Sequence, residues 1–303
     1  MLEIPILLLG YNRPDRLRNL IRSLAPHSPK LLLIAIDGPK QDTPSDLSLV
    51  KECQNVISDI NWDAQVHTRF RKSNLGLQHA VSDAVSWAMS SFGSAIVIED
   101  DVTIGQDFIP YMCHSLRYFR DNLEIAHING YNVVPREQIA TSASSRISRY
   151  PESYAWATWD RSWLHYDPEM TWARSVKLSE LAYLLGNYRS ALKWKLNFAD
   201  AASERVDTWA YRWVGSIWAN NMKVVSPNVN LASYHGWSGG THTFRKPAFK
   251  EIPITDSDIR WWLNELQIDF DKDADSWVGS RVFRESYRGL AEAAIASLIL
   301  SFR

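Results

Sequence analysis

The sequence predicts an α/β fold built on a doubly wound, mainly parallel sheet. Over residues 1–130, short apolar runs alternate with segments of helical periodicity, which is typical of parallel strands joined by helices. The length of 303 residues suits one large α/β domain, or one domain with a smaller subdomain. Polar and charged residues directly follow several of the apolar runs. Because open α/β sheets bind ligands at the carboxyl ends of their strands, these residues mark the expected site.

The strands and helices of residues 1–130 can be placed in chain order. Wholly apolar runs, expected for strands buried on both faces, are 4–9, 31–36, 95–98 and 125–128, and an alternating strand is expected over 64–70. Apolar residues at helical spacing predict a first helix that Pro14 and Asp15 open, and further helices over 43–60, 77–89 and 108–119. In the helix over 43–60, we expect Leu47, Val50 and Ile57 to face the core.

The alternation of strands and helices stops near residue 130. Residues 142–148 are rich in serine and predict a mobile loop, and residues 236–243 predict a loop rich in glycine, serine and threonine. Helical patches are expected over 179–191 and 207–220, with an apolar-faced helix over 285–302. This last helix is too short to span a bilayer, and its polar face is not strongly basic, so packing on the domain is favoured over docking on a membrane.

Composition and charge exclude several classes of protein. The net charge of −1 gives no overall basic field, so no nucleic-acid partner is expected. Cys53 and Cys113 lack metal-ligand spacing and do not suggest a disulfide scaffold, which favours a reducing compartment. We find neither a signal peptide nor an apolar run of transmembrane length. Most of the 14 tryptophans follow residue 150, and they suit either a core or a surface for sugar rings.

Three consecutive carboxylates follow the apolar run 95–98. Glu99, Asp100 and Asp101 would stand at the carboxyl edge of the sheet, and their mutual repulsion favours a bound cation. Oxygen ligands suit Mg²⁺ or Mn²⁺, with phosphate oxygens and waters completing the shell. The alternative is a solvated acidic turn.

Other polar residues fall at the same expected edge. Arg13, after the first strand, could pair with a phosphate or remain solvated in a helix's first turn. Asp37 could accept hydrogen bonds from a base or ribose, or could form a turn with Gly38. Arg71 and Asn74 lie in a cationic loop before a helix N-terminus, which suits an anion, although a merely solvated loop is equally compatible.

The motifs taken together resemble a known family. Tyr-Asn-Arg-Pro at 11–14, Asp-Gly at 37–38, Asn-Leu-Gly-Leu at 74–77 and Glu-Asp-Asp at 99–101 occur in this order. The set resembles GT-A glycosyltransferases, in the region shared by bacterial family 2 enzymes and the N-acetylglucosaminyltransferase I family. Segments of the bacterial members resemble residues 154–163, 207–209 and 239–243, so the likeness covers most of residues 3–245. It implies the GT-A fold, a Rossmann-like mixed, mainly parallel sheet flanked by helices.

The resemblance implies a role for individual residues. Asp101 would ligate the metal, Asp100 would lie near the ribose or donor sugar, and Glu99 would support the turn and contact the sugar. Asp37 would read the base, and Arg13 would lie beside the base and diphosphate. The remaining roles are nucleotide-sugar binding for Arg71, Asn74 and Thr241, general base for Asp207, and acceptor contacts for Trp156 and Trp209. His242 could ligate the metal, donate to a phosphate or cap its loop.

The resemblance also implies a reaction. An inverting, metal-dependent transfer is expected, with Mn²⁺ or Mg²⁺ as cofactor and a UDP-sugar as the favoured donor. The acceptor would be a glycan or a lipid-linked oligosaccharide in bacterial surface polysaccharide synthesis, in the cytoplasm or at the inner face of the membrane. Residues 1–130 would bind the nucleotide sugar, 131–245 would bind the acceptor, and 246–303 would form a helical extension. One departure is the segment 233–237, where the family has Asn-Ile-Gly-Phe-Gly.

Two other functions remain open. A sugar-phosphate nucleotidyltransferase also needs carboxylates for metal, but it has a Gly-rich loop after the first strand, and here Gly10 is the only glycine at that place. A non-catalytic carbohydrate-binding protein could use the tryptophans as a sugar surface, and it would not need the acidic triplet or Asp207.

Overall fold

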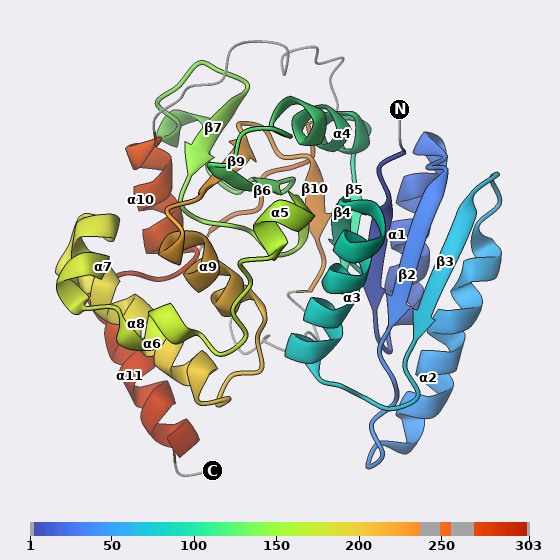
Figure 1. Cartoon of the computed structure of the whole chain (residues 1–303), viewed down its shortest axis with the longest axis horizontal. Helices are drawn as coiled ribbons and strands as arrows, with labels where there is room; N and C mark the ends of the chain where they lie inside the picture. The colour runs from blue at the N-terminus through green and yellow to red at the C-terminus, as the bar shows by residue number, and fades with distance from the viewer. Residues whose placement is uncertain (1–2, 237–248, 256–269, 302–303) are drawn as a thin grey trace.

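The computed structural model describes residues 3–236, 249–255 and 270–301. An eight-stranded sheet in the order β3-β2-β1-β4-β8-β6-β9-β7 forms the centre of the molecule (Figure 1). Its strands are β1 (Ile6–Gly10), β2 (Leu31–Ile36), β3 (Gln65–Phe70), β4 (Ser94–Glu99), β6 (Ile125–Asn129), β7 (Ser145–Ser148), β8 (Ala155–Trp159) and β9 (Lys223–Pro227). A separate antiparallel pair consists of β5 (Val102–Ile104) and β10 (Ala232–Tyr234).

The sheet is mixed but mainly parallel. The pairs β3-β2, β2-β1, β1-β4 and β6-β9 are parallel, while β8 runs antiparallel to both β4 and β6, and β7 runs antiparallel to β9. Helices flank both faces (Figure 1). The mixed α/β fold expected from the sequence is therefore confirmed.

The helices of the first half lie where their periodicity predicts. They are α1 (Pro14–Leu24), α2 (Pro44–Asn55), α3 (Leu77–Phe92) and α4 (Phe108–Tyr118). Side chains alternate between the faces of β1: Leu7 and Leu9 pack with α3, whereas Ile6 and Leu8 pack with α1, α2 and α4. Strands that are apolar on both faces thus hold two cores together.

The helices of the second half pack mainly against one another. They are α5 (Asp160–Trp163), α6 (Thr171–Ser175), α7 (Leu178–Leu185), α8 (Tyr188–Ala202) and α9 (Ala210–Ala219). Helix α5 also contacts β6 and β8. The expected single helix over 179–191 is wrong, because Gly186 adopts φ +80° and divides it into α7 and α8. Such a left-handed residue ends a helix and favours glycine.

Two further expectations are corrected. Residues 145–148 of the expected serine-rich loop form the buried strand β7, because β9 pairs with them along their whole length. In α2, Leu47 is 66% exposed, whereas its neighbour Asp46 is buried and turns toward the loop after β1. The polar contacts of Asp46 therefore determine which side of α2 faces the core. The α-helix also ends at Asn55, earlier than the expected residue 60.

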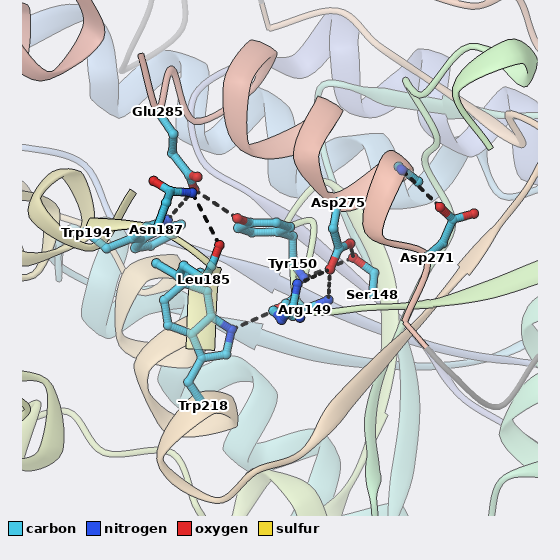
Figure 2. A network of polar contacts seen from close by, with 11 residues as sticks. Ser148, Arg149, Tyr150, Leu185, Asn187, Trp194, Trp218, Asp271, Asp275 and Glu285 are labelled. Atoms are coloured by element: carbon cyan, nitrogen blue, oxygen red, sulfur yellow. Dashed lines mark hydrogen bonds and ion pairs between the residues drawn. The ribbon is translucent and has the colours of Figure 1, made fainter. Parts of the chain in front are cut away.

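Two C-terminal helices, α10 (Lys272–Arg281) and α11 (Tyr287–Ser301), dock on the second half. A chain of polar contacts joins them to it: Asp275 accepts from Ser148, and Glu285 accepts from Tyr150 and Trp194 (Figure 2). Helix α11 packs along α8. Among the described residues, we find no helix with the length and apolarity that a membrane span requires.

Candidate active site

A cavity of about 240 Å³ lies at the carboxyl ends of β1, β2 and β4. Parallel strands end at one edge of a sheet, so residues far apart in sequence meet there. The cavity is lined by eight residues that the sequence singled out: Arg13, Asp37, Arg71, Asn74, Glu99, Asp100, Asp101 and Asp207. Their roles remain predictions, but the structure brings the residues together.

Asp101 is the carboxylate of this cavity that two arginines contact. Its Oδ2 accepts from the guanidinium Nη1 atoms of Arg13 at 3.2 Å and Arg16 at 3.5 Å. Its Oδ1 is buried and has no hydrogen-bond partner among the described residues. Burial raises the pKa of Asp101, and the two arginines oppose that rise. A buried oxygen left without a donor is uncommon in proteins, and it is free to accept from a ligand.

The other two carboxylates crowd against Asp101. Burial raises the pKa of Asp100 to about 7, with repulsion by Asp101 as the next cause. Burial also raises the pKa of Glu99 well above its ordinary value, and Asp101 and Asp100 add to this effect. Three adjacent carboxylates of this kind ionise together only where cations compensate them.

Asp37 and Asn74 hold each other at the end of β2. Asn74 Nδ2 donates to Asp37 Oδ2 at 2.8 Å, and the backbone N–H of Gly38 and that of Leu75 donate to Oδ1 at 2.8 and 3.0 Å. These bonds join the end of β2 to the loop before α3. Both residues line the cavity, yet in this structure their polar atoms bind the protein's own backbone and each other.

Asp46 is a site residue that the sequence analysis missed. Tyr11 Oη donates to Asp46 Oδ2, and Asn12 Nδ2 donates to Asp46 Oδ1 at 2.8 Å. Asp46 thereby holds the loop that carries Arg13. The sequence near Asp46 does not reveal this role, because the two side chains that it holds, those of Tyr11 and Asn12, lie more than 30 residues away. Tyr11, however, stands within the 11–14 motif.

Arg71 faces the cavity together with a second arginine. Asp83 on α3 forms ion pairs with both Arg69, at 3.3 Å, and Arg71. Arg69 also lies over the ring of Trp87. Arg69, Arg71 and Asp83 all line the cavity, so the two arginines leave one positive charge that Asp83 does not offset, which suits a bound anion.

Asp207 reaches the cavity from the second half of the chain. Its Oδ2 accepts from the backbone N–H of Leu77 and its Oδ1 from that of Gln78, both at 2.8 Å, so it caps the N-terminus of α3. Gly76, with φ +79°, lets the chain turn beside the carboxylate: a Cβ there would lie 3.0 Å from Asp207 Oδ2. The Asp207 side chain nevertheless remains exposed.

The acceptor contacts expected of two tryptophans are corrected. Trp156 is 0% exposed and stacks between His127 and Trp209, and Trp209 is itself 2% exposed. Trp209 instead donates a hydrogen bond to Glu99, the first carboxylate of the acidic triplet. Within the described ranges most tryptophans are buried in the core and the others are half-buried, so they do not form an exposed sugar surface there.

Thr241 and His242 lie outside the described residues. The Arg16 contact could have been found from the sequence, because Arg16 stands three residues after Arg13 and shares its helix face. Tyr234, which also lines the cavity, comes from β10, whose pairing with β5 could not be read from local pattern.

Among the residues of the cavity, Asp101 is the one whose carboxylate could hold a divalent cation. Nowhere in the described parts of the chain do three His, Cys, Asp or Glu side chains form a metal-binding group. Mg²⁺ and Mn²⁺ at nucleotide sites are commonly held by one or two carboxylates, with phosphate oxygens and waters as the other ligands. The buried, unpartnered Oδ1 of Asp101 meets that requirement.

Comparison with known proteins gives little. No protein-family model matches the sequence, and no curated protein matches it. Among solved structures, the chain is similar to the apo form of mouse xyloside xylosyltransferase 1. The identity is 8%, the match covers 72% of this chain and 84% of that chain, and the TM-score is 0.35. A likeness at this level carries no argument, so function has to be inferred from the cavity.

Proposed function

We propose that this protein is a glycosyltransferase that moves a sugar from a nucleotide-diphosphate donor to a hydroxyl of a glycan. One observation carries the proposal: an acidic triplet, Arg13, Arg69 and Arg71 line one cavity at the carboxyl ends of parallel strands, and Arg16 contacts the last carboxylate of the triplet beside Arg13. Basic groups suit the diphosphate, and carboxylates suit a cation and sugar hydroxyls.

The proposed reaction requires that the negative charge of the departing diphosphate be stabilised. When the sugar leaves its donor, negative charge grows on the diphosphate, and preorganised cationic groups lower the barrier by stabilising it. Arg13 and Arg16 carry such charge beside Asp101. Mn²⁺ or Mg²⁺, held by Asp101, would supply further stabilisation of the departing diphosphate.

Asp207 is proposed as the general base. Its exposed carboxylate lines the cavity, and a carboxylate on the far side of the sugar would take the acceptor proton, with in-line attack and inversion at the anomeric carbon. The choice of a UDP-sugar, a glycan or lipid-linked acceptor and a cytoplasmic role in bacterial surface polysaccharide synthesis rests on the resemblance of the motifs.

The proposal is tested by screening nucleotide sugars with Mn²⁺ for thermal stabilisation and then for slow hydrolysis of the donor. At least one nucleotide sugar should raise the melting temperature and be hydrolysed. Failure of all of them to bind, with or without Mn²⁺, would reject the proposal. Pyrophosphate release from a nucleoside triphosphate and a sugar phosphate would instead identify a nucleotidyltransferase.

Asp207→Asn tests the base separately. Asparagine keeps the shape and one acceptor oxygen, so donor binding should persist, while turnover should fall roughly 10²- to 10⁴-fold. Donor binding by calorimetry and the melting temperature are measured alongside turnover. Normal turnover would remove Asp207 from the role of base. A parallel loss of donor binding and stability would indicate that it acts only through the cap on α3.

A further inference from the structure

Two arginines one helical turn apart share a single carboxylate at the proposed donor site. Arg13 precedes α1 and Arg16 lies in its first turn, and both contact Asp101 Oδ2. Their side chains are 25% and 23% exposed, whereas that of Asp101 is 7% exposed. The carboxylate is therefore more deeply buried than the two arginine side chains that contact it.

The surroundings of Asp101 restrict what else can approach it. On one side, Gly236 comes so close that a Cβ there would lie 2.6 Å from Asp101 Oδ2. The backbone N–H of His235 donates to the Asp101 carbonyl at 2.7 Å, which fixes this approach. The arginines cover another side, and Oδ1 is buried without a partner among the described residues. A cation at Asp101 would therefore meet the positive charge of both arginines.

A diphosphate changes this balance of charge. It carries more negative charge than one carboxylate, and its oxygens match the guanidinium fork in two-point contacts. Arginines that turn from Asp101 to a diphosphate keep a charged partner, so the exchange leaves no buried cation unpaired. The same movement removes their positive charge from Asp101 and favours a divalent cation there.

We propose that Arg16, acting with Arg13, is a diphosphate-binding residue that occupies Asp101 until the nucleotide enters, so that nucleotide and divalent cation bind cooperatively. This inference rests on the proposed function. It assigns Arg16 opposite effects on two ligands: Arg16 weakens binding of the cation alone and strengthens binding of the nucleotide.

The test measures binding rather than turnover. Free Mn²⁺ is counted by electron paramagnetic resonance, with and without UDP, for the wild type and for Arg16→Met. UDP binding without metal is measured by calorimetry. The matched control is Arg18→Met on the same helix, because Arg18 pairs with Asp15 and Asp59, away from the cavity. Arg16→Lys keeps the charge but loses the fork, and it replaces Arg16→Met if circular dichroism shows the latter unfolded.

In the wild type, UDP should tighten Mn²⁺ binding by a factor within the range of roughly 5 to 150 that is typical of coupled sites. Arg16→Met should bind Mn²⁺ alone more tightly, bind UDP alone more weakly and show a smaller coupling factor. Arg16→Lys should change in the same directions by less, and Arg18→Met should match the wild type.

If the wild type binds UDP with Mn²⁺ but Arg16→Met binds each ligand as the wild type does, the assignment of Arg16 is overturned and the proposed function stands. Weaker binding of both ligands also overturns it, because a merely structural residue has that effect. If the wild type binds no nucleoside diphosphate with Mn²⁺, the proposed function fails and this inference fails with it.

Discussion

Two groups of buried carboxylates in this molecule have opposite surroundings. Near the C-terminus, donors meet each carboxylate: Glu285 Oε1 accepts from Tyr150 Oη at 2.9 Å and from Trp194 Nε1 at 2.6 Å (Figure 2). Asp275 accepts from Ser148 Oγ at 2.6 Å and from the backbone N–H of Arg149 at 3.0 Å. These acids join α10 and the segment before α11 to the sheet and to α8.

The acidic triplet beside the cavity is satisfied less fully. Its carboxylates repel one another, the pKa of Asp100 rises to about 7, and Oδ1 of Asp101 has no partner within the described chain. Buried acids that serve structure are normally saturated with donors, whereas acids crowded against one another, with an oxygen that lacks a donor, are typical of functional sites. The comparison predicts that the two groups respond in opposite ways to the same kind of substitution.

The largest effect is expected from Asp101→Asn, and it should appear in activity. If Asp101 holds the cation that stabilises the departing diphosphate, as proposed, loss of its charge should weaken cation binding and lower turnover roughly 10²- to 10³-fold. Stability should be unchanged or higher, because the cost of burying the charge and its repulsion of Asp100 and Glu99 are relieved, and these outweigh the lost pairing with Arg13 and Arg16. Donor hydrolysis and urea unfolding measure the two quantities. A clear loss of stability with full activity would place Asp101 among the structural acids.

Glu285→Ala should have the reverse effect. It leaves the Tyr150 hydroxyl and the Trp194 indole N–H buried without an acceptor, which costs about 3–5 kcal/mol in the free energy of unfolding. Activity of the molecules that remain folded should be close to that of the wild type. The control Glu124→Ala breaks a surface ion pair with Lys223 and should cost at most about 1 kcal/mol. Equal losses in the two variants would contradict the structural role of Glu285.

The sequence predicts those parts of the site whose closeness depends only on the direction of the strands. Residues after β1, β2 and β4 meet because parallel strands end at one edge, so Arg13, Asp37 and Asp101 could be placed together in advance. Asp207 could be placed there by resemblance, but its cap on α3 depends on a contact across 130 residues of chain. Local pattern carries no information on such a contact.

The expectations that proved wrong share one physical cause. A tryptophan suits a core and a sugar surface equally well, so Trp156 could not be assigned to the core until β8 was known to lie between β4 and β6. Similarly, residues 145–148 become a strand because β9, some 80 residues later, supplies their backbone partners. In both cases tertiary pairing overrides local composition.

The smallest effect, and the sharpest test of the comparison, concerns the pH dependence at Asp275. Burial raises its pKa to about 6, even though Ser148 and Arg149 stabilise the ionised form. The folded state therefore binds this proton more tightly than the unfolded state, so the carboxyl lowers the free energy of unfolding as pH rises from about 4 to about 6. At 1.36 kcal/mol per pKa unit, the loss amounts to roughly 2–3 kcal/mol.

Asp275→Asn cannot ionise and should escape this loss. The difference in unfolding free energy, variant minus wild type, should increase between pH 4 and pH 6 and then level off, as measured by urea unfolding across that range. Any fixed cost of the amide shifts the whole curve without changing its slope. A difference that stays constant from pH 4 to pH 7 would show that the donors around Asp275 fully offset its burial. The contrast between the two groups of acids would then be stronger than the pKa of Asp275 implies.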